Sequence, residues 1–371
     1  MRGRIEAVQA REPFIPGLTL SKLFYEEAVK PILAARFPRL VYSAAHIGRG
    51  SDVLGFDTPR STDHGWGPKV TLFVSDAVDE RTRADIVSVL GDTLPYDIHG
   101  YPTHFASPSV DGGHLEKISS RPITHGVGVW TTRAFFVEQL GLDPYRELTA
   151  ADWLTLPQQR LRAVTAGAVF HDGLGELEPL RRTFHYYPRD VWLYMLAAQW
   201  RRISQEEPFM ARCGDVGDEI GSRLIAARLV HDLMLLCFLM ERTYAPYSKW
   251  FGTAFARLRC AAQLTPIFTA ITGATSWQER QEHFSQAYAV AASLHNGLGI
   301  TPPLPTRVSL FHTRPYLVIH GERFAAAIRD AIQSPEVRDL PQHIGAIDQF
   351  VDSTDILSYT EASARLKDLY Q

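Results

Sequence analysis

The sequence contains little cysteine. Its 371 residues include only three cysteines, at positions that match no metal-binding spacing: Cys213, Cys237 and Cys260. A disulfide scaffold and a zinc site built from neighbouring cysteines are therefore not expected. A reducing cytoplasm is the expected compartment, because disulfides persist mainly outside it.

Long uncharged apolar runs are also scarce. The most apolar stretch, 224–240, is interrupted by Arg228 and Asp232, so it predicts a buried helix rather than a membrane span. The first residues, MRGRIEAVQAREPF, contain no apolar signal core, and secretion is not expected. No membrane partner is predicted.

No strong excess of charge of either sign is present. Lys and Arg total 38 against 41 Asp and Glu, which gives a net charge of −3, so general nucleic-acid binding is not expected. Hydrophobic residues make up 45% and charged residues 21%, typical of a globular protein with a large core. A chain of this length predicts roughly two domains.

The first 150 residues alternate between short strand and helix patterns. Apolar residues at helical spacing predict a helix over 17–37, and a second is predicted over 79–91. Strands are predicted over 69–75 and 123–132, with a short β-prone run at 40–42. This alternation favours a small α/β domain over residues 1–150.

Residues 151–371 have a different pattern. The sequence predicts a helix over 152–170 and a turn over 171–177. Long amphipathic patterns follow from Pro188 onward. A short hairpin is predicted within 307–320. The sequence therefore predicts an α+β protein with an N-terminal mixed-sheet domain, 1–150, and a mainly helical bundle domain, 151–371.

A Gly-Ser pair, Gly50-Ser51, precedes an acid, Asp63, by twelve residues counted from the serine. Backbone amides at such a turn can bind phosphate, and hard carboxylate oxygens can bind Mg²⁺. The order is compatible with a phosphate-binding turn formed by Gly50, Ser51 and Asp52, with Asp63 placed where a strand would start. A plain glycine-rich loop is the alternative.

The strings GRGSDVLGFDTPRSTDHGWGP, YYPRDVWLYMLAAQW, GDEIGSRLIAARLV, YAPYSKWFGTAF and IGAIDQFVDSTDIL resemble the DUF4037 family of nucleotidyltransferase-like proteins, over essentially the whole chain. The resemblance implies a fold similar to that of aminoglycoside nucleotidyltransferases, within the polymerase-β-like group. It implies that Gly50 and Ser51 hold the phosphates of a nucleoside triphosphate, with ATP expected. It also implies that Asp63 binds Mg²⁺ arriving with that nucleotide.

Two positions depart from the pattern that this resemblance implies. The second metal ligand is expected two residues after the first, where this chain has Gly65. The third acid is expected on the strand at 123–132, which contains no acid. Because glycine has no side chain to bind a metal, the predicted ligand set is incomplete.

Three residues of the helical half are candidates for the same site. Lys249 would contact the triphosphate as a point charge, and Glu219 would act as general base on an acceptor hydroxyl. Arg189 belongs to a local basic cluster suited to phosphate. The structural alternatives are a helix-start lysine, an acid favoured by the helix dipole and an ion-paired arginine.

The leading hypothesis is a nucleotidyltransferase that transfers a nucleoside monophosphate to a hydroxyl of a small molecule in an interdomain cleft, with Asp63 and Glu219 as catalytic residues. The alternative is a catalytically degenerate fold that binds a nucleotide or another ligand for sensing or scaffolding. A third hypothesis, a metal-assisted hydrolase, rests on histidines whose intervals match no zinc pattern, namely His99, His104, His114 and His125.

Overall fold

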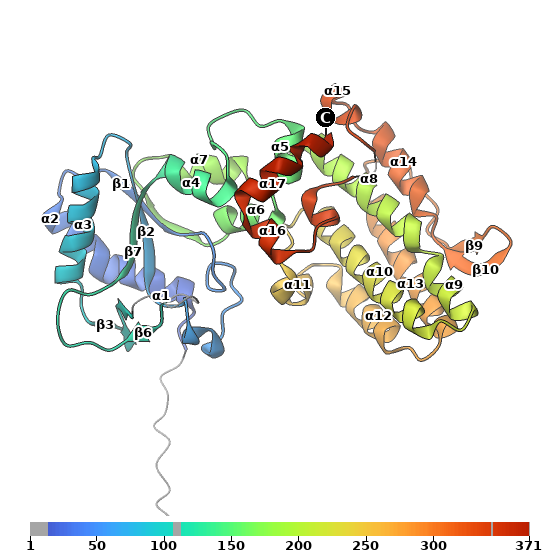
Figure 1. Ribbon diagram of the computed structural model, residues 1–371, viewed down its shortest axis with the longest axis horizontal. Helices are drawn as coiled ribbons and strands as arrows, with labels where there is room; N and C mark the ends of the chain where they lie inside the picture. The colour runs from blue at the N-terminus through green and yellow to red at the C-terminus, as the bar shows by residue number, and fades with distance from the viewer. Residues whose placement is uncertain (1–13, 107–112, 343, 371) are drawn as a thin grey trace, which may run out of the picture. The chain divides into compact units, whose positions relative to one another are not determined.

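The computed structural model describes residues 14–106, 113–342 and 344–370 (Figure 1). Helix accounts for 55% and strand for 11%, which confirms the predicted α+β class. The chain divides into two compact units, with residues 1–144 and 163–183 in unit 1 and residues 145–162 and 184–371 in unit 2. It therefore passes from one unit to the other three times, whereas the sequence suggested a single boundary near residue 150.

Unit 1 is built on a four-stranded mixed sheet in the order β7-β2-β1-β8. The strands are β1 (Tyr42–His46), β2 (Lys69–Val74), β7 (Gly126–Thr131) and β8 (Ala168–Asp172). Strand β1 is antiparallel to both β2 and β8, and β2 is parallel to β7. The predicted strands at 69–75 and 123–132 are confirmed.

Strand β8 corrects the sequence interpretation, which placed a helix over 152–170 and a turn at 171–177. The helices α5 (Ala150–Thr155) and α6 (Gln158–Thr165) fill most of that range, and the chain then adds an edge strand to the sheet. The strand is short and its residues are only partly buried, so its sequence, AVFHD, lacks a clear alternation of buried and exposed positions.

One face of the sheet is covered by the predicted N-terminal helix. It consists of α1 (Gly17–Phe24), a π-helical turn η1 (Tyr25–Val29) and α2 (Lys30–Arg36). Leu20 and Phe24 are fully buried in one cluster with Leu72 of β2. The π turn ends two residues before Pro31, which has no N–H to continue the regular hydrogen-bond ladder.

The remaining elements of unit 1 connect and cover the strands. The predicted helix at 79–91 is α3 (Glu80–Thr93), which begins where the Asp79 side chain accepts a hydrogen bond from the Thr82 amide. Two further helices are α4 (Thr132–Leu140) and α7 (Leu177–Thr183). The long connection at 92–122 contains the short pairs β3 (Asp97–Ile98) with β4 (Tyr101–Pro102) and β5 (His104–Phe105) with β6 (Leu115–Glu116).

Unit 2 is mainly helical, as predicted. Its principal helices are α8 (Arg189–Glu206), α9 (Phe209–Asp215), α10 (Glu219–Met240), α11 (Ser248–Phe255), α12 (Ala261–Gly273), α13 (Trp277–Gly297) and α14 (Gly321–Asp330). Shorter helical segments follow at α15 (Pro335–Arg338), η3 (Ile347–Gln349), α16 (Thr354–Ser358), α17 (Thr360–Arg365) and η4 (Leu366–Tyr370). The predicted hairpin is β9 (Ser309–Phe311) with β10 (Arg314–Val318).

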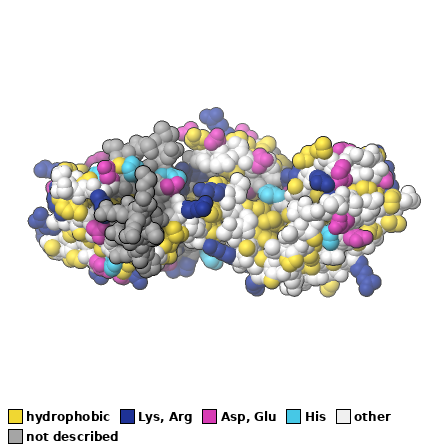
Figure 2. Space-filling view, turned by 90° about the horizontal axis from the view of Figure 1, so that it is seen from below, with side chains coloured by type: hydrophobic (Ala, Val, Ile, Leu, Met, Phe, Trp, Pro, Cys, Tyr) yellow, Lys and Arg dark blue, Asp and Glu magenta, His cyan; other side chains and the backbone are white. Residues whose placement is uncertain are grey.

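The apolar stretch at 224–240 forms the greater part of α10. Leu233, Leu236 and Phe238 in it are fully or almost fully buried. Among the described residues, none of the helices has the length and apolar character needed to span a membrane. On the face drawn in Figure 2, Lys and Arg side chains are interspersed with Asp and Glu.

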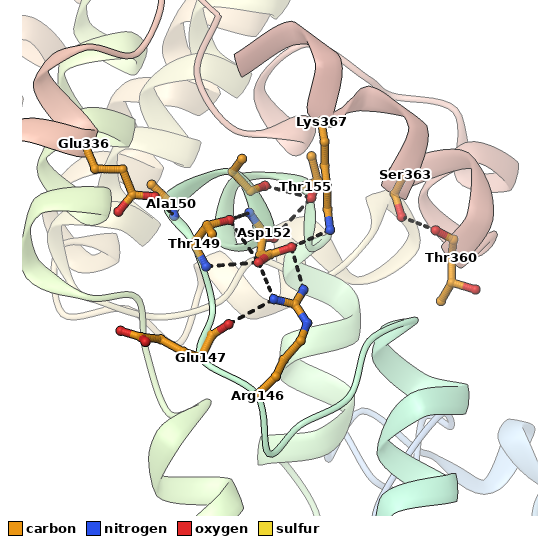
Figure 3. Close-up of polar contacts among 11 residues, drawn as sticks. Arg146, Glu147, Thr149, Ala150, Asp152, Thr155, Glu336, Thr360, Ser363 and Lys367 are labelled. Atoms are coloured by element: carbon orange, nitrogen blue, oxygen red, sulfur yellow. Dashed lines mark hydrogen bonds and ion pairs between the residues drawn. The ribbon is translucent and has the colours of Figure 1, made fainter. Parts of the chain in front are cut away.

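A buried carboxylate joins the C-terminal segment to α5 within unit 2 (Figure 3). Asp152 accepts hydrogen bonds from Arg146 at 2.6 Å and from the Thr149 amide and hydroxyl at 2.9 Å each. Lys367 of η4 donates to its other oxygen. Burial favours the neutral carboxyl, but the donors outweigh it and hold the pKa of Asp152 well below its ordinary value.

Candidate functional site

The Gly-Ser pair lies in a tight turn directly after β1. Gly48 and Gly50 have φ angles of +111° and +142°, which side-chain-bearing residues rarely adopt. A Cβ on Gly50 would also lie 2.2 Å from Oδ1 of Asp52. The turn is closed by the Phe56 amide donating to the Ser51 carbonyl at 2.8 Å, so Ser51 occupies a tight turn, and no helix follows it.

Four consecutive backbone amides of this turn are left without a partner. Within the described part of the chain, the N–H groups of Arg49, Gly50, Ser51 and Asp52 donate no hydrogen bond. Successive N–H groups flanking residues of positive φ form a concave cluster of donors that suits an anion. We call residues 48–52 the amide turn.

The side chain of Asp52 has a separate role from its amide. Its Oδ2 lies 2.7 Å from Nε2 of His46, the last residue of β1, and both side chains are buried. Burial alone would raise the pKa of Asp52. The hydrogen bond and charge of His46 and the charge of Lys69 together have a larger, opposite effect, so the pKa lies below its ordinary value. This carboxylate is therefore ionised and held by His46 beneath the turn.

A second acid of the segment anchors the start of α1. Oδ2 of Asp57 accepts a hydrogen bond from the Gly17 amide at 2.6 Å and from Nε1 of Trp66 at 3.0 Å. Trp66 is almost fully buried and packs on the ring of Phe14. Asp57 thus has a structural role, and it fixes the chain that leads toward β2.

Asp63 does not lie at the start of a strand, which corrects the sequence prediction. It ends a 3-10 helix, η2 (Pro59–Asp63), and β2 begins six residues later at Lys69. The strand cannot begin earlier because Pro68 has no N–H to pair and Trp66 turns into the core. The Asp63 side chain is 68% exposed and contacts Nδ1 of His64 at 3.0 Å.

Gly65 leaves open space where the resemblance places a second ligand. It has a φ of +60°, and a Cβ built on it would meet no atom within 4 Å. Its carbonyl accepts a hydrogen bond from the Lys69 ammonium. In the described residues, no three His, Cys, Asp or Glu side chains are grouped so that they could hold a metal ion. The residues present therefore do not fit a two-metal centre.

The histidines of the hydrolase hypothesis contact separate partners. His99 lies 3.0 Å from Glu27, the His104 ring accepts from the Thr124 amide at 2.9 Å, and His125 contacts the Val87 carbonyl at 3.0 Å. His114 is exposed. Each of the first three rings serves a local contact, and nothing in their arrangement favours a shared metal.

The three candidates of the helical half belong to unit 2. Glu219, the first residue of α10, is engaged by two arginines, Arg280 at 2.6 Å and Arg223 at 3.0 Å. Arg189 contacts Asp190 at 2.7 Å and is half exposed. Lys249 is exposed in the first turn of α11, with its ammonium 5.1 Å from the Trp250 ring. Their contact with a nucleotide stays a prediction.

Two residues close to the amide turn were not singled out from the sequence, namely His46 and Lys69. His46 ends a strand, and Lys69 begins one beside a glycine-rich segment. Neither belongs to a recognisable motif, and the only sequence signal is a basic residue at each strand end that borders the Gly-rich segment.

Residues 153–251 match the model of a family described as a domain of unknown function, DUF4037. The predicted resemblance to the DUF4037 proteins is confirmed for this segment, which contains two of the five strings that suggested it in full and most of a third, YAPYSKWF. No curated protein matches the chain.

One solved structure is similar to this chain, a nucleotidyltransferase-like protein from Exiguobacterium sibiricum 255-15. The sequence identity is 10%, and the likeness covers 74% of this chain and 77% of that one, with a TM-score of 0.32. This is a distant likeness, and the substrate of the present chain has to be inferred from its own side chains.

Proposed function

We propose that unit 1 binds the phosphate groups of a nucleoside triphosphate at the amide turn, and that it acts as a nucleotide-binding module. The observation that carries this proposal is the set of four consecutive unpartnered amides at residues 49–52. Unpaired backbone N–H groups are costly when removed from water, and an anion satisfies several of them at once.

The amides by themselves select an anion, and the likeness to nucleotidyltransferase-like proteins suggests a nucleotide. The backbone of the turn offers four donors, and Oδ2 of the nearby Asp52 carboxylate is paired with His46. The Ser51 hydroxyl is half exposed and can donate one further hydrogen bond. A triphosphate offers enough oxygens to use all of these donors.

Binding without two-metal catalysis follows from the carboxylates. Asp63 is the only acid at an expected ligand position, and Gly65 has no side chain to join it. Two metals about 3.5–4 Å apart need bridging carboxylates on both sides. Unit 1 therefore supports phosphate recognition better than phosphoryl chemistry.

Nucleotidyl transfer to a small-molecule hydroxyl is the second candidate. One observation favours it: the Asp63 carboxylate is 68% exposed and free of any arginine or lysine ion pair within the described residues. Mg²⁺ carried by a triphosphate needs only one or two protein carboxylates. Glu219, the predicted general base, is less suited, because two arginines already bind it.

Titration calorimetry with ATP, GTP, CTP and UTP tests the proposal, and Gly50→Ala is the decisive variant. A methyl group at this position meets Asp52 and forces φ away from +142°, so it should disperse the amides. Losing charge-assisted hydrogen bonds to phosphate should weaken binding by about 10- to 100-fold.

Gly175→Ala is the matched control. Gly175 also has a positive φ, +70°, but a Cβ there meets nothing within 4 Å, and it lies beyond β8 rather than at the turn. This variant should bind as the wild type does. The proposal is wrong if no nucleoside triphosphate binds, or if folded Gly50→Ala binds as tightly as Gly175→Ala.

A further inference from the structure

Lys69 brings a partly buried cation to the start of β2. Its ammonium has three donors, and only one is used, toward the Gly65 carbonyl. The Phe105 ring lies 5.8 Å from the ammonium. Among the described residues, no carboxylate lies within ion-pair distance of the ammonium, so two of its N–H groups remain available to an anion.

The backbone holds this ammonium in place. The Lys69 amide donates to the buried Ser21 hydroxyl of α1 at 3.1 Å, and Lys69 pairs with Gly126 of β7. The Lys69 stem also lies against Gly126, where a Cβ would come within 2.9 Å of it. A long flexible side chain is thus confined, which lowers the entropy lost when it binds an anion.

The backbone of Lys69 lies near the end of β1, where the amide turn begins. Strands β1 and β2 are antiparallel with Ala45 opposite Thr71, so the end of β1, where the turn begins, borders the first residue of β2. Burial lowers the pKa of Lys69, and the charge of the nearby Asp52 raises it. Lys69 and the amide turn thus lie at the same end of the β1–β2 pair, and the charge of Asp52 acts on the Lys69 ammonium.

The position of the hydrogen bond to Gly65 is informative. The resemblance noted from the sequence implies a metal-binding carboxylate at the position of Gly65. Here the carboxylate is missing, and a protein cation is bound to that residue instead. The charge at this position is therefore of the opposite sign. Acids at an enzyme site would attract a metal ion, whereas the Lys69 ammonium would attract phosphate directly.

We infer that the Lys69 ammonium is the counter-cation of the bound phosphates and takes the electrostatic role of a second metal ion, so that the nucleotide binds without Mg²⁺. This inference rests on the proposed phosphate binding at the amide turn. The contrasting reading is that Lys69 only ties β2 to the Gly65 loop, in which case its loss affects stability and leaves binding unchanged.

Titration calorimetry with ATP in excess EDTA and in excess Mg²⁺ tests the inference. The wild type should bind ATP about equally well in both buffers. Lys69→Met should weaken binding in EDTA by about 10- to 100-fold, the loss of one charge-assisted contact. Lys69→Arg, which keeps the charge, should recover most of it.

Lys30→Met, at an exposed position of α2, is the control for removing a lysine and should bind as the wild type does. Thermal melts verify that each variant is folded. If Gly50→Ala weakens binding and Lys69→Met does not, the phosphate site stands and the role of Lys69 is wrong. If EDTA abolishes wild-type binding, a metal performs the role, and the inference is equally wrong.

Discussion

Asp152 in unit 2 and Asp52 in unit 1 are both buried carboxylates, 3% and 2% exposed, and both have cations nearby. Their surroundings differ in how completely the charges are used. Asp152 accepts from Arg146, Lys367 and two groups of Thr149, so both of its oxygens are engaged. Asp52 has one side-chain partner, His46, and the nearby Lys69 has only a carbonyl.

The difference separates a structural charge cluster from a binding site. A polar network whose members are all satisfied rigidifies the fold and has nothing left to offer a ligand. A partly buried cation and amides that lack partners among the described residues need an explanation, since native proteins leave few such groups unpaired. The saturated cluster therefore stabilises unit 2, and the unsaturated one is the site at which we propose that a ligand binds unit 1.

The largest expected effect comes from breaking the saturated cluster. Asp152→Ala leaves the Arg146 and Lys367 charges without their shared carboxylate, and because water reaches both cations, the loss of these hydrogen bonds to a charged group should cost about 1.5–3 kcal/mol. The free energy of unfolding of unit 2, measured by urea denaturation, should fall by that amount. Calorimetric ATP binding to the folded fraction should be unchanged.

Glu26→Gln is the control, because Glu26 forms an exposed pair with Lys22 at 3.9 Å that should contribute little. Acid gives a second readout. Because the folded pKa of Asp152 is depressed, its stabilisation is complete above the ordinary value of about 3.9 and is lost as pH falls below it. The gap between wild type and Asp152→Ala should therefore narrow in acid, and a constant gap would contradict the ion-pair explanation.

Replacing Glu219 should lower the stability of unit 2 by a smaller amount. The Glu219 carboxylate binds Arg280, which is 1% exposed, so Glu219→Gln should lower the urea midpoint by less than Asp152→Ala does and should leave nucleotide binding unchanged. Arg223→Gln, which removes only the exposed partner, serves as its control. Loss of a nucleotidyl-transfer activity in stable Glu219→Gln protein would instead support the predicted general base.

Much of the fold was predictable because hydrophobic periodicity reports burial. The helix at 17–37 and the strands at 69–75 and 123–132 follow from apolar spacing alone, and the structure has them. Strand β8 was missed because it is a short edge strand whose partner, β1, lies over 100 residues earlier. Pairing of that kind leaves no local signal.

The site was predictable only in part. Gly50 and Ser51 stood out because a Gly-Ser turn has a distinctive sequence, and they lie in the turn whose amides are unpartnered. Lys69 did not stand out, because its proposed role depends on a tertiary contact: its side chain reaches back to the carbonyl of Gly65, four residues earlier. Asp63 was placed on a strand because an acid precedes an apolar run, but Pro68 delays the strand to Lys69.

The smallest effect is expected at Asp63, where it separates a binding module from an enzyme. The side chain is 68% exposed, so Asp63→Ala should change the free energy of unfolding by no more than about 0.5 kcal/mol. ATP binding in EDTA should stay the same, because the inferred phosphate contacts are amides and Lys69. A wild-type pyrophosphate release that Asp63→Ala abolishes would overturn the binding-module proposal.

Gly65→Asp tests the same point in the opposite direction. The left-handed φ of +60° costs an L-residue about 1–2 kcal/mol, but Asp tolerates it better than most, and the space is open. A carboxylate here would compete for the Lys69 ammonium and, together with Asp63, create a cation site. ATP binding should then become Mg²⁺-dependent, and Asp63→Ala in the Gly65→Asp background should remove that dependence. If Gly65→Asp binds ATP as the wild type does in both buffers, the charge at Gly65 does not control the site, and Lys69 is a structural residue like those around Asp152.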